Sequence, residues 1–346
     1  MSTPLDSSND AAFANAPESR RISRVLMVCP ELPSKSNPGS MAPAARQIES
    51  IRRLGIHTDI VDMRGIPKLK YALALRKIRS VAKRTDVIHA HFGFCGWLAR
   101  IATIGISKPI VMSFMGDDLL GTPREDGTLE RLSKVFVRWN LHLAKKMDQV
   151  IVKSQEMAEV INPTACTVVP NGVDLEKFRP IDSVRARQKV GLPKSGHLVL
   201  FPGNPDNPRK GHSLAKASVD RAAAVLGEPI DLIPLWNVDP WEVPYYMNAC
   251  DLMLMTSFIE GSPNVVKEAL ACDVPVIGVD VGDVRQMLAG VQACSCCDRD
   301  PNLISREIVR TLQNHPPCDG REILIRRGLD LESVAERVHE IYKQAI

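Results

Sequence analysis

Leu252-Met-Leu-Met-Thr-Ser-Phe-Ile-Glu-Gly-Ser-Pro-Asn-Val-Val-Lys-Glu-Ala-Leu-Ala271 runs from an apolar segment through a small-residue loop into a helical pattern. The apolar run 252–255 predicts a buried strand. The pattern from 265 to 271 predicts a helix, so the loop leads from the carboxyl end of a strand into a helix. This unit is the building block of parallel α/β sheets.

The same unit recurs on both sides of this stretch. Apolar, β-branched runs predict strands at 24–29, 58–62, 86–91, 109–114, 149–154, 197–201, 230–235, 251–256 and 275–279. Helical patterns cover 41–54, 72–84, 129–146, 213–226 and 264–271. Alternating strands and helices form parallel sheets covered on both faces. Two such series predict an α/β protein of two doubly wound Rossmann-like domains facing a cleft, with ligands at the carboxyl ends of the strands.

Turn signals divide the chain. Asn171-Gly172 and two flanking prolines mark a break near 168–180. We therefore expect a first domain over 21–168 and a second over 169–330. Residues 331–346 predict a last helix, and the sequence leaves open whether it packs back on the first domain. The polar segment Met1–Arg20 lacks the apolar core of a signal peptide and predicts a disordered lead-in.

Bulk composition excludes several classes of protein. The 346 residues are 45% hydrophobic and 24% charged, as in soluble globular proteins. A net charge of +4 and the lack of a basic tract with interleaved aromatics give no support for a nucleic-acid partner. Nine scattered cysteines suggest reduced thiols in a cytoplasmic protein. Cys294, Cys296 and Cys297 lack a second ligand pair, so we expect no metal site.

Glu260 and Glu268 flank the small loop before the predicted helix. A helix N-terminus attracts phosphate through its free N–H groups. Carboxylates would repel phosphate, so these two suit the hydroxyl groups of a sugar, and together the features predict a nucleotide-sugar site. The alternative is structural: Ser262 caps the helix and the acids favour its dipole.

The loop Phe201-Pro-Gly-Asn-Pro-Asp-Asn-Pro-Arg-Lys-Gly211 carries a pair of cations, Arg209 and Lys210, close to its end. A fixed cation pair at the end of a strand can neutralise a diphosphate leaving group. An ordinary solvated polar loop is the alternative, and we favour the functional interpretation because Glu260–Glu268 lies in the same domain.

Four segments then follow in order: Val169-Pro-Asn-Gly-Val-Asp174, Pro208-Arg-Lys-Gly211, Glu260-x7-Glu268 and Pro275-Val-Ile-Gly278. Together they resemble the retaining glycosyltransferases of family 4, which have the two-domain GT-B fold. The resemblance implies that Glu260 contacts the donor sugar, that Glu268 contacts the nucleotide ribose, and that Lys210 and the loop amides hold the diphosphate without a metal. It implies a donor site formed by Gly203, Asn204, Gly261, Ser262, Pro263, Asn264, Val265 and Glu268, with Arg209, Lys210, Glu260 and Asp118 as catalytic candidates.

The first half resembles the family less closely. His89-Ala-His91 and Ser113-Phe-Met-Gly-Asp-Asp118 match family segments, but Met115 stands where histidine is usual. Asn204 likewise stands where arginine is common. The acceptor side would comprise Gly39, Ser40, His91, Met115 and Gly116. Asp118 suits a functional role and a helix cap equally well.

Residues 64–84 contain eight basic residues and no acidic one. Leucines and other apolar residues are interleaved with them, which is typical of a basic amphipathic helix. Such a helix can bind an anionic membrane surface, and a solvated charged face is the equally good alternative.

The function that these features predict is a metal-independent retaining glycosyltransferase without a cofactor. Its donor would be a UDP- or GDP-sugar and its acceptor a glycan or lipid-linked saccharide, as in cell-surface polysaccharide synthesis. We expect it in the cytoplasm, with a peripheral position at the inner membrane face if the basic segment binds lipid. The alternatives are another GT-B enzyme, an epimerase or hydrolase, and a degenerate member that binds nucleotide-sugar or glycan without turnover.

Overall fold

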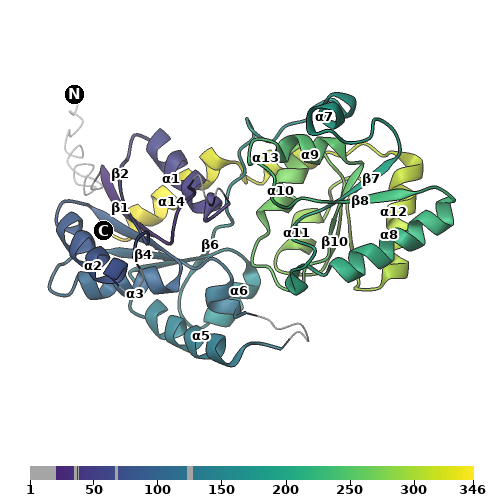
Figure 1. Ribbon diagram of the computed structural model, residues 1–346. Coiled ribbons are helices and arrows are strands. Elements are labelled where there is room, and N and C mark those ends of the chain that lie inside the picture. Colours follow the sequence, from purple (N-terminus) through teal and green to yellow (C-terminus); the bar gives the residue numbers. More distant parts are fainter. Residues whose placement is uncertain (1–20, 35–36, 38, 67–68, 123–127) are drawn as a thin grey trace, which may run out of the picture.

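The computed structural model describes residues 21–34, 37, 39–66, 69–122 and 128–346. It contains two parallel sheets, each covered by helices on both faces, side by side along the long axis of the molecule (Figure 1). The lead-in predicted for 1–20 lies outside the described residues. The two-domain α/β architecture is the predicted one.

The first sheet has the strand order β2-β1-β3-β4-β5-β6, and all its neighbouring strands are parallel. Its strands are β1 Arg24–Cys29, β2 His57–Asp62, β3 Val87–His91, β4 Ile110–Ser113, β5 Gln149–Val152 and β6 Thr167–Val168. Its helices are α1 Ala42–Arg53, α2 Leu69–Ala82, α3 Gly93–Ala102, α4 Asp117–Leu120, α5 Arg131–Ala144 and α6 Gln155–Ile161. Helices α2, α3, α5 and α6 share one core with the sheet, and α1 covers the opposite face.

The second sheet has the order β11-β10-β9-β7-β8. Its strands are β7 His197–Phe201, β8 Ile230–Pro234, β9 Leu252–Met255, β10 Val276–Val279 and β11 Ser295–Cys297. Helices α8 His212–Leu226 and α12 Pro301–Asn314 pack on one face. The other face carries α9 Val243–Ala249, α10 Asn264–Ala271, α11 Val284–Leu288 and α13 Gly320–Arg326. Helix α7 Ser183–Val190 packs against α9.

In both sheets the chain adds strands first toward one edge and then toward the other, and two loops lie side by side where this change occurs. In the second sheet the chain runs from β7 outward to β8 and then back across to β9, so the loops after β7 and β9 leave the same edge as neighbours. Ligands of open α/β sheets bind at such switch points. The predicted cation pair and Glu260 lie in these two loops.

The last helix, α14 Leu331–Gln344, returns to the first sheet, where the yellow ribbon lies among purple and blue elements (Figure 1). Its buried side chains, Tyr342 among them, complete the core that α1 forms on the first sheet. The chain therefore passes between the domains twice. The two crossings are joined by hydrogen bonds from the Val173 N–H to the Leu329 carbonyl, at 2.9 Å, and from the Leu331 N–H to the Val173 carbonyl, at 3.1 Å.

Candidate active site

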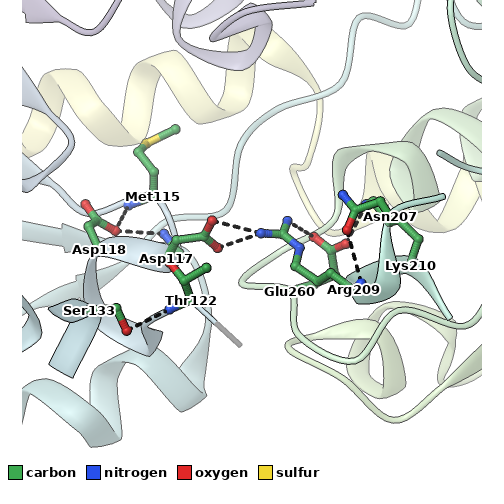
Figure 2. A network of polar contacts seen from close by, with 10 residues as sticks. Met115, Asp117, Asp118, Thr122, Ser133, Asn207, Arg209, Lys210 and Glu260 are labelled. Carbon is green, nitrogen blue, oxygen red and sulfur yellow. Dashed lines mark hydrogen bonds and ion pairs between the residues drawn. The ribbon is translucent and has the colours of Figure 1, made fainter. Parts of the chain in front are cut away.

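Three charged side chains of the second domain converge in the cleft. Lys210 Nζ donates to Glu260 Oε1 at 2.8 Å, and an Arg209 guanidinium nitrogen lies 3.7 Å from Glu260 Oε2. Arg209 and Lys210 belong to a short 3₁₀ turn after β7, and Glu260 lies in the loop after β9 (Figure 2). The two cations and the carboxylate are thus placed by adjacent strands, and none of them is more than about a quarter exposed.

Gly203 lets the lysine lie across the loop. Its backbone has φ +145°, and a Cβ there would lie 3.0 Å from Lys210 Cγ. A larger residue would therefore push the Lys210 stem away from Glu260. The neighbouring Asn204 does not point its oxygen at the cations, because Asn204 Oδ1 accepts the Asp206 N–H at 3.0 Å.

The loop before α10 leaves the helix N-terminus uncapped. Pro263 is the N-cap residue and makes no side-chain hydrogen bond to the first turn. Ser262 is therefore not the cap; its hydroxyl instead accepts a 2.9 Å hydrogen bond from the fully buried Lys267. Asn264 and Val265 open the helix, and the N-cap residue provides no side-chain acceptor for the N–H groups of its first turn. Burial lowers the pKa of Lys267 to about 8.

The first domain meets this loop directly. A Cβ on Gly261 would lie 3.4 Å from Gly116 Cα and 3.5 Å from the Met115 carbonyl oxygen, which are contact distances, and 3.2 Å from Met157 Sδ, which would have to shift. Arg209 also reaches across, donating to both carboxylate oxygens of Asp117 at 2.9 and 2.8 Å (Figure 2). The predicted donor loop and the predicted Met115–Gly116 segment therefore form one site.

Asp118 holds the loop of the first domain together. Its carboxylate accepts the N–H groups of Met115 and Gly116, both at 2.9 Å, and of Gly93 at 3.1 Å. Burial raises the pKa of Asp118 to about 6, and the three backbone hydrogen bonds act in the opposite direction. The side chain is 4% exposed. Asp118 thus binds backbone N–H groups but is not the predicted helix cap, because Gly116 is the N-cap residue of α4 and no side chain caps that helix. The neighbour Asp117 pairs with Arg209 across the cleft.

His91 lies beneath the site. It is fully buried beside His89, with ring centroids 4.2 Å apart, and neither ring nitrogen has a hydrogen-bond partner among the described residues. Burial, with a smaller effect of Lys153, lowers the pKa of His91 to about 3. His89 is bonded to Tyr342 Oη at 2.6 Å and Ser113 Oγ at 2.8 Å. The imidazole of His91 is therefore neutral at physiological pH.

Glu268 lines a cavity of about 550 Å³ between the domains. Gly39 forms part of its first-domain wall, while Trp236 and Phe178 belong to the second-domain wall. Arg46 of α1 donates to Glu268 Oε1 at 2.7 Å across this space. Ser40, the other residue predicted beside Gly39, uses its hydroxyl to bind the Glu31 carbonyl; Pro38 lies outside the described residues.

The basic segment 64–84 forms α2 and its flanks. Arg79 donates to the Ala102 and Ile104 carbonyls, and Arg64 pairs with Asp62 at 2.8 Å. The exposed cations that remain on and after the helix are Arg76, Lys77, Lys83 and Arg84. Lys68 lies outside the described residues.

Within the described part of the chain, no group of three or more His, Cys, Asp or Glu side chains could hold a metal ion. The nine cysteines are all free thiols. Of the helices that the structure describes, none is long and apolar enough to cross a membrane.

Several site residues are missing from the sequence prediction: Asp117, Arg46, Lys267 and Trp236. The sequence did contain an indication of Asp117, because two adjacent carboxylates follow a strand and a glycine there. Neighbouring side chains point in different directions, so one of the two can be buried while the other faces the cleft. The sequence contained no indication of Arg46 or Trp236, because their positions depend on how the two domains meet. Lys267 follows the helical pattern, and its burial reflects packing that the pattern does not encode.

Comparison with known proteins agrees with this geometry. Residues 20–177 match Glycosyltransferase Family 4, and residues 197–314 match Glycosyl transferases group 1. TuaC of Bacillus subtilis (strain 168), named as a glycosyltransferase of teichuronic acid biosynthesis, is 26% identical over 324 residues, covering 83% of this chain and 80% of its own. The UDP-Gal:alpha-D-GlcNAc-diphosphoundecaprenol alpha-1,3-galactosyltransferase of Escherichia coli is 24% identical over 262 residues, 66% of each chain.

Solved structures share the fold. Sucrose-phosphate synthase of Thermosynechococcus elongatus superposes with a TM-score of 0.72 at 18% identity, covering 94% of this chain and 99% of that one. Anabaena HepE in complex with UDP-glucose gives a TM-score of 0.69 at 18% identity, covering 92% and 98%. The strand order of the two sheets and both family matches agree. This chain belongs to the family 4 glycosyltransferases and has the GT-B fold.

Proposed function

We propose that this glycosyltransferase moves a sugar, with retention of anomeric configuration, from a UDP- or GDP-sugar to a glycan or lipid-linked saccharide. The observation that carries the proposal is the convergence of Lys210 and Arg209 on Glu260, next to the uncapped N-terminus of α10. Two cations beside free helix amides suit a diphosphate, and a carboxylate between them suits a sugar hydroxyl.

The names of the relatives support a role in cell-surface polysaccharide synthesis. TuaC is named for a cell-wall polymer, and the Escherichia coli relative for a lipid-diphosphate acceptor and a UDP-sugar donor. HepE was solved with UDP-glucose. These properties belong to those proteins, and we extend them to this chain as part of the proposal.

In the proposed reaction the bond from the anomeric carbon to the diphosphate oxygen breaks, and charge develops on that oxygen. Lys210, Arg209 and the amides of residues 262–264 would stabilise this charge, which is the largest kind of contribution in such sites. Glu260 would orient the donor sugar through its hydroxyl groups. No metal is needed for this step, because the cations and the helix amides supply the positive charge.

The acceptor hydroxyl would attack from the side that the diphosphate leaves, and the departing phosphate would accept its proton. No protein nucleophile is involved. The pair with Arg209 brings the Asp117 carboxylate of the first domain beside these groups. Contact between Gly261 and Gly116 would keep water from the donor while the domains are together.

In the ribose part of the site, Glu268 would accept ribose hydroxyls in the 550 Å³ cavity, whose wall includes Trp236 and the backbone at Gly39. Arg46 holds Glu268 in the described structure, so a bound ribose would share or replace that contact. The donor base would then lie toward Trp236, an aromatic surface suited to stacking.

A thermal-shift panel of UDP, GDP, UDP-glucose, UDP-galactose, UDP-N-acetylglucosamine and GDP-mannose tests the donor proposal. A ligand at a hundredfold excess over its dissociation constant stabilises the folded state by about 2.7 kcal/mol. We expect one base to stabilise the protein, and Glu268→Ala to reduce that shift. No shift with any of the six ligands would contradict the proposal, and NMR of the product would establish whether configuration is retained.

A second candidate function, nucleotide-sugar binding without transfer, is favoured by Met115. Its backbone contacts the Gly261 region where a histidine is usual in the resembled family. Met115→His distinguishes the candidates. A large gain in transfer would show a lost activity, and transfer by the unchanged protein would exclude the binding-only role. Product formed without any acceptor would instead indicate a hydrolase or epimerase.

We also propose a peripheral position at an anionic membrane, through the exposed cations of α2. Flotation with vesicles of phosphatidylglycerol and phosphatidylcholine tests it, since electrostatic binding weakens as salt is added. Salt-sensitive flotation would support the membrane contact, and its absence would contradict it.

A further inference from the structure

A second, larger cavity of about 940 Å³ lies in the first domain, among α2, α3 and α5. Its walls are mainly aromatic: Tyr71, Phe92, Phe94, Trp97, Phe136 and Trp139. Asp117 also lines it, so the cavity extends to the residue that pairs with Arg209 in the cleft. It is therefore continuous with the acceptor side of the proposed active site.

Several polar groups of this cavity have partners within the chain, whereas the buried Trp97 Nε1 has none among the described residues. The Asp118 carboxylate binds three backbone N–H groups, and Asn140 donates to the Asp118 carbonyl at 2.8 Å. Ser133 accepts the Thr122 N–H and donates to the Glu130 carbonyl. A ligand in this cavity consequently meets mainly aromatic walls, and the polar groups open to it include the Trp97 N–H and, at the cleft, Asp117.

The aromatic rings are held at fixed angles although they are exposed. Phe136 and Trp139 of α5 are 50% and 58% exposed and meet edge to face with ring centroids 6.0 Å apart. Phe94 contacts Tyr71 and Phe92 in the same manner, at 6.4 and 5.6 Å. Large apolar side chains gathered on one surface mark a site of interaction.

The two helices beside these rings carry basic charges, while Asp117 and Asp118 also line the cavity. From Arg131 to Lys146, helix α5 and the two residues after it contain basic residues and no acidic one. The exposed ones are Arg131, Lys134, Arg138, Lys145 and Lys146. Helix α2, on the other side of the cavity, is likewise free of acidic residues. The ligand that complements an aromatic groove between two basic helices is an apolar chain joined to an anionic group.

We propose that this groove binds the isoprenoid or acyl chain of a lipid-linked acceptor. The phosphate of that acceptor would lie among the cations of α2 and α5, and its saccharide would reach Asp117 in the cleft. The proposal rests on the proposed glycosyltransferase function and narrows its acceptor from glycans in general to amphiphiles with an anionic linkage.

Two soluble probes test it without knowledge of the donor or the sugar. Farnesyl diphosphate and dimethylallyl diphosphate share one headgroup and differ in chain length, so any binding of the diphosphate at Lys210 is common to both. Isothermal titration calorimetry on the full chain, below the aggregation concentration of the probe, should show at least tenfold tighter binding of farnesyl diphosphate, since each buried methylene contributes.

A matched pair of variants locates that preference. Phe136→Ala combined with Trp139→Ala should reduce the chain-length preference at least fivefold. Both side chains are half exposed, so we expect the fold to persist, and the melting temperature of the variant checks this. The control is Trp241→Ala, a tryptophan of the second domain that is 52% exposed and does not line this groove; its preference should equal that of the unchanged protein.

Equal binding of the two probes, or an unchanged preference in the double variant, would overturn the proposal. So would binding to anionic vesicles without preference for farnesyl diphosphate, which would assign the rings to a bilayer surface. The nucleotide-sugar thermal shift is measured on the same proteins. A normal shift with no chain preference rejects the groove alone, whereas failure of every nucleotide-sugar rejects the proposed function.

Discussion

The two walls of the cleft differ in what they offer a ligand. On the second-domain wall, Lys210, Arg209 and Glu260 keep their charged ends in the cleft, and the α10 amides have no capping side chain. On the first-domain wall, the polar atoms of Asp118 and His89 are hydrogen-bonded within the protein, and His91 is buried. Asp117 and a set of aromatic rings line the accessible surface of this wall. The second-domain wall, the proposed donor side, is therefore marked by charged residues in short sequence motifs. The first-domain wall, the proposed acceptor side, is marked by aromatic side chains from several helices.

The largest effect should come from the donor wall. We expect Lys210→Met to lower kcat about a hundred- to a thousandfold, the usual loss when one group that stabilises developing charge is removed. The measurement is transfer at saturating donor. Lys216→Met, which changes an exposed lysine of α8, is the control and should leave kcat within twofold. A loss below tenfold for Lys210→Met would mean that the leaving group is stabilised elsewhere.

On the acceptor wall two adjacent carboxylates should separate fold from function. Asp118→Ala leaves buried backbone N–H groups without acceptors and should cost about 3 kcal/mol of unfolding free energy. Asp117→Ala removes a carboxylate that is 41% exposed and should cost less than about 1 kcal/mol while reducing transfer. Urea unfolding and transfer assays on both variants check this. Equal stabilities would show that Asp118 is not the structural residue.

Glu268 tests whether the ribose contact can be separated from the chemistry. We expect Glu268→Gln to weaken nucleotide binding about tenfold, roughly 1.4 kcal/mol, with kcat at saturating donor little changed. Arg46→Met frees Glu268 and should strengthen binding by a few-fold. Calorimetry with the nucleotide found in the thermal-shift panel measures both. Weaker binding in Arg46→Met would instead make Arg46 part of the nucleotide site.

The smallest effect concerns the buried lysine under the acceptor wall. Lys153 is 1% exposed, donates to the Val169 carbonyl, and has its pKa lowered from 10.5 to about 7 by burial. Because the folded state binds fewer protons than the unfolded state between these values, stability should rise by about 1 kcal/mol from pH 7 to pH 8. Lys153→Met should remove that part of the slope in urea unfolding, and Lys216→Met should not. A slope unchanged by Lys153→Met would show that the lysine stays charged.

The sequence predicts the regular part of the fold well. Every predicted strand is present, with ends that differ by at most two residues, because buried parallel strands are long apolar runs with clear boundaries. The strands β6 and β11 were missed. The predicted helices also leave out α3, α4, α6, α7, α9, α11, α12 and α13. β6 and β11 have only two and three residues and no fully buried position, so they carry too little apolar pattern.

The proposed donor side could be predicted because its residues lie in two short loops. Each loop is a continuous sequence motif, and the two follow adjacent strands of one sheet. The acceptor side could not be predicted, because its aromatic groove draws on α2, α3 and α5 and depends on their packing. A signal did exist in α5: Phe136 and Trp139 lie three positions apart in a helix with no acidic residue. Aromatics on a basic helix, rather than single polar residues at strand ends, were the features to follow.

The return of α14 to the first domain has a consequence for the order in which the chain folds during synthesis. Val338, Ile341 and Tyr342 fill the core beneath β1 and α1, yet the ribosome makes them only after the whole second domain. Until α14 has been made, the first half of the nascent chain therefore exposes the part of this apolar face that α1 does not cover. The second domain, whose core needs no residue from α14, can fold before the domain that precedes it.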